Sequence, residues 1–495
     1  MNVSIIRRIL GYVLILEAVM LILPCIVALI YGEDEVTAFI ITAAICLAVG
    51  TAIGIKKPKD NVFYLKEGCV ATGFSWVFLS LFGCLPFILS GAIPHFTDAL
   101  FETVSGFTTT GASILDEVES LPKSILFWRS FTHWVGGMGI LVFLLAIVPM
   151  SGGTGSNINL MKAESPGPSV GKIRPKMRTT ASYLYVMYIA ITVLEIVFLV
   201  AGRMPLFDAV TTAFGTAGTG GFGIKNDSIG SYSPYIQWVV TVFMIAFGVN
   251  FNAYFLLLFG QFKRALSIDE IRWYFILIIS STCILFAATY EKLYGASDAL
   301  RHSAFQVASI ITTTGFSTVD FDMWHGAAKT VLVMLMFVGA CAGSTGGGIK
   351  VSRFIVAGKS VLREIRSYVH PKSVENMKMD GKTLDKNTVK ATNIYLITFM
   401  FVFMASMFLV SLEGHDLTTN FTAIAATINN IGPGLSLVGP TRNFGFFSDF
   451  SKYVFIFDML AGRLELFPML LILNPILWKD TAKQGIRRHR KPKSL

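Results

Sequence analysis

The chain has 495 residues, of which 53% are hydrophobic and only 15% are charged, and its formal net charge is +10. Soluble chains carry about 25% charged residues, so this composition and a mean hydropathy of +0.63 exclude an ordinary soluble protein. Many apolar runs reach the length of about 20 residues that a helix needs to cross a bilayer. We therefore predict an all-α polytopic membrane protein.

Apolar spans follow one another along the whole chain. The first begins after basic residues, as in a signal peptide, but its apolar run is too long and has no clear cleavage site, so we predict a transmembrane helix. Both termini are predicted on the same side of the membrane. The ten predicted spans are 9–31, 36–55, 68–91, 124–149, 182–202, 235–260, 271–290, 328–349, 393–412 and 453–478.

The segments between the spans alternate in charge. One set is basic and includes Arg7, the stretch 350–390 and the tail 481–495, whereas the other is acidic and includes residues 116–119 and Asp320. Because Lys and Arg accumulate on the cytoplasmic side, both termini are predicted to be cytoplasmic. We interpret the basic tail as an anchor beside anionic membrane lipid, not as a nucleic-acid-binding segment.

Two glycine-rich stretches imitate nucleotide-binding motifs. Residues 218–223, GTGGFG, match G-x-G-x-x-G but follow no predicted strand. Residues 343–350, GSTGGGIK, place the lysine one position late for a P-loop, and no Ser or Thr follows it. The six cysteines form no C-x-x-C pair and the seven histidines no H-E-x-x-H motif. We therefore predict no organic cofactor and no zinc site.

The outer segments repeat one pattern of a short helix followed by glycine-rich chain. Two of them, 101–113 and 305–317, share F-x-x-x-S-x-x-T-T-T-G-x-S, and 210–223 and 422–435 match more weakly. Non-helical backbone at membrane depth is tolerated where it is buried in protein or lines a wet cavity, so the pattern predicts a pore. The four copies each lie between two spans, and the first two spans stand outside them. By alignment the closing glycines are Gly111, Gly220, Gly315 and Gly432.

The chemistry of these segments suits a monovalent cation. An ion that leaves water must exchange its hydration shell for other oxygens, and backbone carbonyls supply them. Glycine permits the backbone angles that turn carbonyls toward one axis, and the short helix directs its negative C-terminal end at the ion. The four strands contain no carboxylate, which disfavours a divalent-cation site.

The chain resembles the Trk/Ktr/HKT superfamily of potassium transporters. The resemblance rests on the four glycine segments together with WRSFTHWVGGMGI (128–140), GVNFNAYF (248–255), GACAGSTGGGIKVSRF (339–354) and AGRLELFP (461–468). The resemblance covers nearly the whole chain. The two extra N-terminal spans make the chain more similar to the TrkH branch than to KtrB. The resemblance implies four pseudo-symmetric span–pore-loop–span repeats around one central pore. The boundaries are 1–60 for the extra helices, 61–165, 166–265, 266–385 and 386–480 for the repeats, and 481–495 for the tail.

The resemblance also implies roles for individual residues. Glycine in all four closing positions favours potassium, the transported ion, over sodium. The filter residues are expected to be Thr109, Thr110, Gly111, Thr219, Gly220, Thr314, Gly315, Ile431 and Gly432. The gate is expected to consist of an intramembrane loop and a pore arginine, namely Gly343, Ser344, Thr345, Gly346, Gly347, Gly348, Lys350 and Arg463.

Two features of this gate keep a second interpretation. From composition alone, a helix kink or a close helix contact explains the glycine-rich loop as well as a gate does. Burial of the charged Arg463 side chain within the last span costs free energy, so the residue needs a role there. That role is either a barrier in the pore or a structural interaction with Glu465 or with loop carbonyls. Both interpretations of Arg463 remain open at this point.

The expected function is potassium uptake across the bacterial plasma membrane. The resemblance implies a homodimer and a cytosolic TrkA-like nucleotide-binding regulatory ring, for which the basic stretch 350–390 is either a docking surface or a lipid-facing one. An alternative within transport is a sodium-permeable or ion-coupled pore. An intramembrane protease or lipid transferase would need a catalytic constellation at membrane depth, which the sequence does not convincingly contain, so we predict no enzyme.

Overall fold

The computed structural model describes residues 1–56, 64–139, 177–290, 295–371 and 376–479. The predicted basic tail, 481–495, and the last third of the predicted span 124–149 lie outside these residues. The described part is helical except for loops and one hairpin, in which β1 (Lys378–Met379) pairs antiparallel with β2 (Lys382–Thr383).

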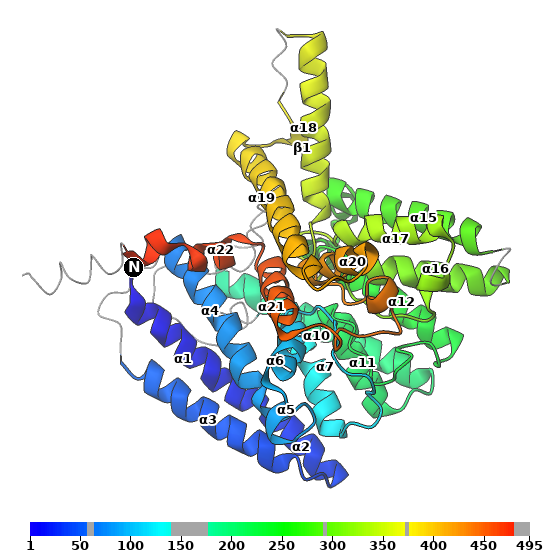
Figure 1. Ribbon diagram of the computed structural model, residues 1–495. Coiled ribbons are helices and arrows are strands. Elements are labelled where there is room, and N and C mark those ends of the chain that lie inside the picture. Colours follow the sequence, from blue (N-terminus) through cyan, green and yellow to red (C-terminus); the bar gives the residue numbers. More distant parts are fainter. Residues whose placement is uncertain (57–63, 140–176, 291–294, 372–375, 480–495) are drawn as a thin grey trace, which may run out of the picture.

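The N-terminal helices form a separate layer at one edge of the molecule (Figure 1). They are α1 (Val3–Met20), α2 (Ile22–Tyr31) and α3 (Val36–Gly54). The α1 and α3 backbones touch, because a Cβ on Gly11 would lie 2.7 Å from the carbonyl oxygen of Gly50. Glycine at such a crossing lets two membrane helices approach closely. The layer packs against the next helix, α4, through α1.

The rest of the chain consists of four units, each with a long helix, a short helix and a second, shorter partner helix. The first contains α4 (Leu65–Gly83), α5 (Leu85–Leu89), α6 (Phe96–Phe107) and α7 (Lys123–Gly137). The second contains α10 (Met177–Ala201), α11 (Leu206–Gly218), α12 (Pro234–Gly248), α13 (Phe251–Leu258) and α14 (Phe262–Leu266). The third contains α15 (Asp269–Thr289), α16 (Ala296–Ile311), η1 (Phe321–Met323), α17 (Gly326–Phe337) and α18 (Val351–Val369). The fourth contains α19 (Lys386–Ser411), α20 (Leu417–Ile428), η2 (Ser436–Val438), α21 (Asp449–Arg463) and α22 (Phe467–Leu473).

Three of the predicted spans are interrupted; the glycine-rich loop expected within 328–349 accounts for one interruption, whereas the other two were not expected. Within the described residues, six helices are long and apolar enough to cross a membrane, or seven if α12 and α13, bent by 93°, count as one. The predicted spans 235–260, 328–349 and 453–478 break after Gly248, Phe337 and Arg463. Hydropathy alone does not detect these breaks, because the chain stays apolar where it turns.

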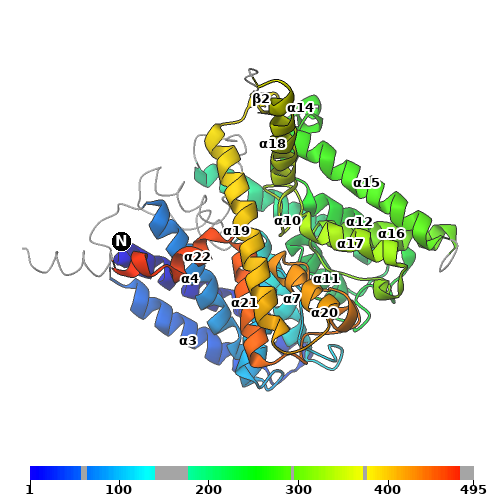
Figure 2. The same ribbon diagram turned by 45° about the horizontal axis from the view of Figure 1, so that its top comes forward.

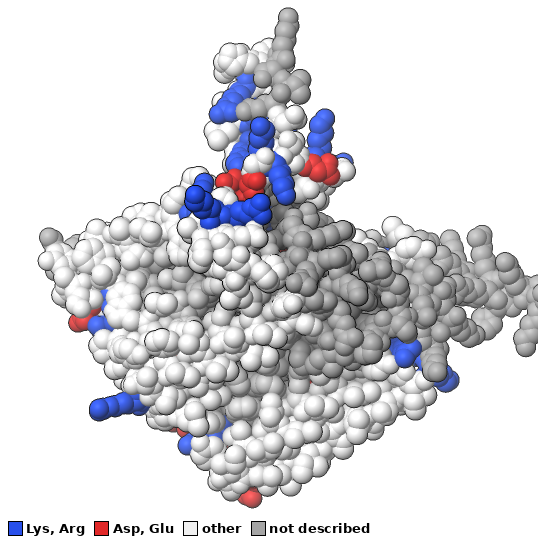
Figure 3. Space-filling model, turned by 180° about the vertical axis from the view of Figure 1, so that it is seen from behind, with Lys and Arg blue, Asp and Glu red and all other residues white. Residues whose placement is uncertain are grey.

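The outer surface of the helices is apolar. On α19, for example, Phe401 is 72% exposed and Phe408 is 67% exposed. Figure 3 shows a largely uncharged body, with Lys and Arg gathered around one projection. That projection is α18, which extends away from the body with the β1–β2 hairpin beside it (Figures 1 and 2). An apolar belt between charged ends is what a lipid bilayer requires of a polytopic protein.

Candidate functional site

The four short helices α6, α11, α16 and α20 end in the same backbone turn. Each closes with an amide that donates to the carbonyl five residues earlier: Thr110 to Ser105 (2.9 Å), Gly220 to Gly215 (2.8 Å), Thr314 to Ser309 (2.8 Å) and Ile431 to Ala426 (2.8 Å). The residue before each of these amides is left-handed: Thr109 (φ 56°), Thr219 (φ 54°), Thr313 (φ 58°) and Asn430 (φ 56°). Such a turn caps a helix and redirects the chain. The backbone therefore repeats four times, including in the two weakly matching copies.

A second left-handed residue follows two positions later in each copy, and it is always glycine. These residues are Gly111 (φ 79°), Gly221 (φ 79°), Gly315 (φ 83°) and Gly432 (φ 99°). A Cβ on Gly111 would overlap the carbonyl oxygen of Gly220, and a Cβ on Gly221 that of Thr314. A Cβ on Gly315 would likewise overlap the carbonyl oxygen of Ile431.

The circle closes between the last copy and the first. A Cβ on Gly432 would lie 2.8 Å from the carbonyl oxygen of Thr110. Each glycine thus packs against the strand of the next repeat, in the order one, two, three, four, one. The four strands, which are far apart in the sequence, consequently form one ring.

The backbone corrects one part of the sequence alignment. The glycine that matches Gly111 is Gly221, not Gly220, which instead takes the position of Thr110, Thr314 and Ile431. Gly220 is glycine for another reason, because a Cβ there would overlap the imidazole ring of His133. Sequence alone did not separate the two adjacent glycines.

All nine residues expected in the filter lie at this ring, and the sequence missed Gly221, Thr313 and Asn430. The spacing of Thr109 to Gly111 was a signal for Thr313, whereas nothing in the sequence marked Asn430. The ring glycines Gly111, Gly221 and Gly315 remain partly exposed, although the residues just before them are buried. Partial exposure within a buried segment is expected of residues that line an opening.

Side-chain hydroxyls brace the strands of the first and third repeats. The hydroxyl groups of Thr108 and Thr110 lie 2.8 Å apart, and those of Thr312 and Thr314 lie 2.7 Å apart. In the fourth repeat, Asn430 Nδ2 donates to Thr110 Oγ1 (2.9 Å) and thereby joins the fourth strand to the first. These contacts engage the hydroxyls of Thr108, Thr110, Thr312 and Thr314 in bracing, whereas Thr109 Oγ1 and Asn430 Oδ1 are buried without a hydrogen-bond partner among the described residues.

The glycine-rich loop after α17 packs directly against the ring. The Gly347 amide donates to Thr313 Oγ1 (2.6 Å). A Cβ on Gly346 would lie 3.0 Å from the carbonyl oxygen of Thr312, and a Cβ on Gly347 would lie 2.8 Å from that of Asn429. The loop therefore abuts the ends of two short helices, those of the third and fourth repeats.

Several contacts hold the loop in this position. Glu270 Oε1 accepts the amides of Ala342 (2.7 Å) and Ser352 (3.0 Å), which clamps both ends of the loop to α15. The Lys350 ammonium donates to the carbonyls of Gly346 and Gly347. Left-handed glycines at Gly343 (φ 72°) and Gly348 (φ 66°) allow the chain to fold back between these points.

The remaining expected gate residues lie on the same loop. Gly343 accepts the Phe251 amide through its carbonyl (3.0 Å), and Ser344 donates its hydroxyl to the Cys341 carbonyl (2.7 Å). The Thr345 hydroxyl donates to the Phe247 carbonyl (3.3 Å). All three contacts tie the loop to itself or to the break between α12 and α13.

Arg463 joins this loop to the first repeat. At the C-terminus of α21, its guanidinium donates to the carbonyls of Thr345 (2.9 Å), Gly136 (2.5 Å) and Gly137 (2.8 Å). The suggested pairing of Arg463 with Glu465 is wrong, since Glu465 forms its salt bridge with Arg353. Bonding to loop carbonyls, the other suggestion, is what the structure contains.

Comparisons with known proteins agree with this architecture. Residues 35–481 match the family model TrkH, described as a cation transport protein. The Trk system potassium uptake protein TrkH of Salmonella typhimurium is 36% identical, over 97% of this chain and 100% of the relative. TrkG of Escherichia coli, also named a Trk system potassium uptake protein, is 29% identical over 97% of this chain and 99% of the relative.

Solved structures extend the agreement to the fold. The crystal structure of the potassium transporter TrkH from Vibrio parahaemolyticus superposes with a TM-score of 0.86 at 32% identity, covering 97% of this chain and 100% of that one. These names describe transport and not a catalysed reaction, as expected from the sequence. The extent of the family match and of these similarities leads to one conclusion: the chain belongs to the TrkH family of cation transport proteins.

Proposed function

We propose that this protein conducts potassium into the cell through the ring of four glycine strands. The observation that carries the proposal is the closed ring, in which Gly111, Gly221, Gly315 and Gly432 each pack against a carbonyl of the next repeat. Carbonyls fixed around one axis replace the hydration shell of a monovalent cation. The names of the relatives support potassium as the ion. Rubidium, of similar size, is expected to pass as well.

Conduction of this kind needs no covalent chemistry. The protein is proposed to lie in the bacterial plasma (inner) membrane with both termini in the cytoplasm. A membrane potential supplies about 2.3 kcal/mol per charge per 100 mV, which drives cation accumulation without ATP hydrolysis in this chain. Potassium is therefore a cargo, and we propose no catalytic residue and no organic cofactor.

The glycine loop and Arg463 are proposed to form the gate. The support is their position, since residues 343–348 abut the strands of two repeats and Arg463 crosses from the fourth repeat to the third and the first. In this state the loop is held by Lys350 and Glu270. Opening would require the guanidinium to leave its three carbonyls, after which the loop could move without unwinding a helix.

The partners are proposed to be a second copy of the chain and a cytosolic TrkA-like nucleotide-binding regulatory ring. The names of the relatives support a multicomponent system, because they describe a Trk system protein. The projecting helix α18 carries the basic side chains of Lys359, Arg363 and Arg366, which offers a charged surface for docking at the cytoplasmic side.

Cation flux into vesicles that contain the purified chain tests the function. With the regulatory ring and its nucleotide present, potassium and rubidium are expected to enter faster than into empty vesicles. Equal rates in both vesicles would refute the proposal. Replacement of potassium by sodium tests the alternative, because comparable sodium flux would indicate a sodium-permeable or ion-coupled pore.

A further inference from the structure

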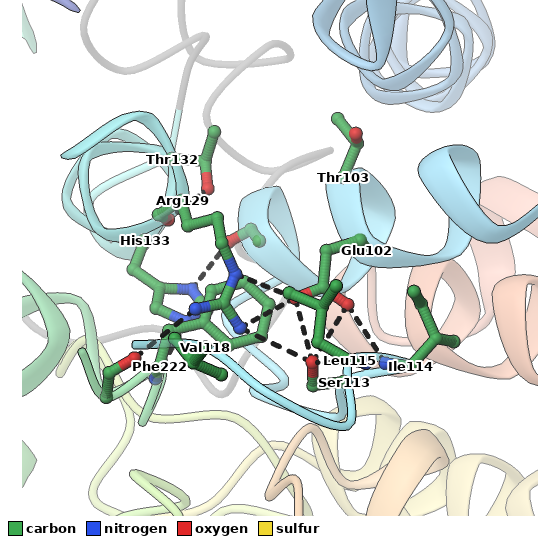
Figure 4. Close-up of polar contacts among 12 residues, drawn as sticks. Glu102, Thr103, Ser113, Ile114, Leu115, Val118, Arg129, Thr132, His133 and Phe222 are labelled. Carbon is green, nitrogen blue, oxygen red and sulfur yellow. Dashed lines mark hydrogen bonds and ion pairs between the residues drawn. The ribbon is translucent and has the colours of Figure 1, made fainter. Parts of the chain in front are cut away.

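A buried ion pair joins α6 and α7, two helices of the first repeat, beside Phe222 of the second strand (Figure 4). Arg129 on α7 donates through Nε to Glu102 Oε1 on α6 at 2.8 Å, and Nη2 lies 2.7 Å from the same oxygen. The two side chains are only 2% and 0% exposed. Charges at this depth are expensive unless they are paired and fully hydrogen-bonded, so the remaining bonds of the pair are informative.

Those remaining bonds reach both neighbouring strands. On the first strand, the Glu102 carboxylate accepts the Ser113 hydroxyl (3.0 Å) and the Ile114 amide (3.1 Å), just beyond the ring glycine. On the second strand, Arg129 Nη1 donates to the Gly223 carbonyl (3.3 Å), and the guanidinium stacks 4.1 Å from the ring centre of Phe222. The pair therefore bridges two strands that are separated by about one hundred residues.

His133, one helical turn after Arg129, makes a second bridge. Its Nε2 accepts the Phe222 amide (3.2 Å) on the second strand. Because Nε2 is an acceptor, the proton is on Nδ1, which donates to the Gly106 carbonyl (2.7 Å) at the end of α6. The imidazole of His133 also fills the space beside Gly220. The imidazole thus acts as a spacer of fixed tautomer between the first short helix and the second strand.

The network belongs to one of the four junctions and is not part of the repeated scaffold. In the fourth repeat, a Cβ on Gly462 would overlap the carbonyl oxygen of Ile428, just as a Cβ on Gly136 would overlap that of Phe107 in the first repeat. Gly462 and Gly136 therefore occupy equivalent positions. Counting back from these glycines, Phe455 and Met459 stand where α7 has Arg129 and His133. On the short helices, Thr212, Gln306 and Ala423 stand where α6 has Glu102. Both side-chain polar atoms of Gln306 have no hydrogen-bond partner among the described residues.

We infer that Glu102, Arg129 and His133 are positioning residues that set the spacing between the first and second strands and thereby part of the preference for potassium over sodium. The inference rests on the proposed function. Selectivity in a carbonyl ring depends on the number and arrangement of its oxygens, and the network bonds the first strand just after Gly111 and the second strand just after Gly221. Among the described residues, the positions equivalent to Glu102 on the other three short helices are uncharged, so the buried ion pair behind the strands is specific to this junction.

The test compares variants of the full-length protein by the ratio of rubidium to sodium uptake into vesicles. Arg129→Lys keeps the charge but loses the planar fork that reaches two partners. The double variant Glu102→Gln/Arg129→Gln removes both charges and leaves neither buried alone. His133→Gln keeps one donor and one acceptor but not the ring. Each is expected to lower the ratio by about tenfold, the equivalent of one hydrogen bond to a charged group.

The matched control is the double variant Lys452→Gln/Asp98→Asn. Lys452 and Asp98 form a second ion pair (2.6 Å) between α21 and α6, at the end of α6 that is far from the ring. Its loss is expected to lower the melting temperature without changing the ratio. An equal fall of the ratio in this control would mean that any weakened helix contact alters selectivity, and would overturn the inference.

The outcomes separate the inference from the proposed function. Unchanged ratios in the folded Glu102→Gln/Arg129→Gln and His133→Gln proteins would reduce the network to a structural role. If the Arg129 variants do not fold, the uptake ratio of the His133→Gln protein alone decides between a positioning role and a structural role. If the unmodified protein carries no potassium, the proposed function fails, and the difference in melting temperature between potassium and sodium solutions still tests ion discrimination. A difference equal in His133→Gln and the unmodified protein would then refute the inference.

Discussion

Replacement of Arg463 by alanine is expected to open the pathway beneath the ring. The change removes three hydrogen bonds, to Thr345, Gly136 and Gly137. Bonds from charged groups contribute about 1.5–3 kcal/mol each. Because the guanidinium is half-buried and the three bonds are not independent, a total of about 3 kcal/mol is reasonable for the closed state. That energy corresponds to roughly a hundredfold shift toward the open state.

The assay is rubidium uptake into vesicles without the regulatory ring, where the unmodified protein is expected to be mostly closed. Arg463→Lys is the matched variant, because it retains a positive charge but bonds fewer carbonyls at once. If the bonds hold the gate, both variants conduct more than the unmodified protein. If the positive charge itself is the barrier, only the Arg463→Ala variant conducts more than the unmodified protein. Unchanged uptake by a well-folded Arg463→Ala protein would refute the gating role and leave Arg463 as a structural residue.

Three further outcomes are expected. Gly315→Ser should relax the discrimination between potassium and sodium, because a side chain at φ 83° is strained and would displace the neighbouring strand; intact discrimination in the flux assay would contradict this. Gly220→Ala should lower the melting temperature, and a second change, His133→Ala, should restore part of the loss by making room, whereas additive losses would contradict the packing argument. Asp416→Ala should cost about 1 kcal/mol, because Asp416 caps α20 through the Thr419 amide (3.0 Å). The bonds from Thr419 also lower the pKa of Asp416, so this contribution is present above the ordinary carboxyl pKa and is lost as pH falls through the lowered value; a pH series of melting temperatures on the unmodified protein and Asp416→Ala measures it.

The sequence was sufficient for the class of fold and for the region of the site. The repeated TTTG predicted the ring at Gly111 and Gly315, because a string of three threonines and a glycine is conspicuous in an apolar chain. It was not sufficient for the register at Gly220 and Gly221. Both residues are glycine, one for its backbone angle and the other for its packing against His133, and only three-dimensional contacts distinguish the two causes.

The breaks in the second helices were also beyond prediction from hydropathy. After α21 the chain turns at Glu465 (φ 55°) and Leu466 (φ 68°), two residues with no intrinsic preference for left-handed angles. Tertiary contacts impose that turn, among them the salt bridge of Glu465 to Arg353. The partners of Arg463 were hidden for a similar reason, since backbone carbonyls such as that of Gly136 carry no sequence signal.

The order in which the ring glycines touch their neighbours has a consequence for how the pore can vary. Each glycine presses on the strand that follows it, so a substitution at Gly111 is felt first at Gly220, not at its own carbonyl. Because each contact joins two neighbouring strands, adjacent repeats should couple more strongly than opposite ones. A single chain with four unlike junctions can then adjust one contact while the other three stay constant, a freedom that four identical subunits would not have.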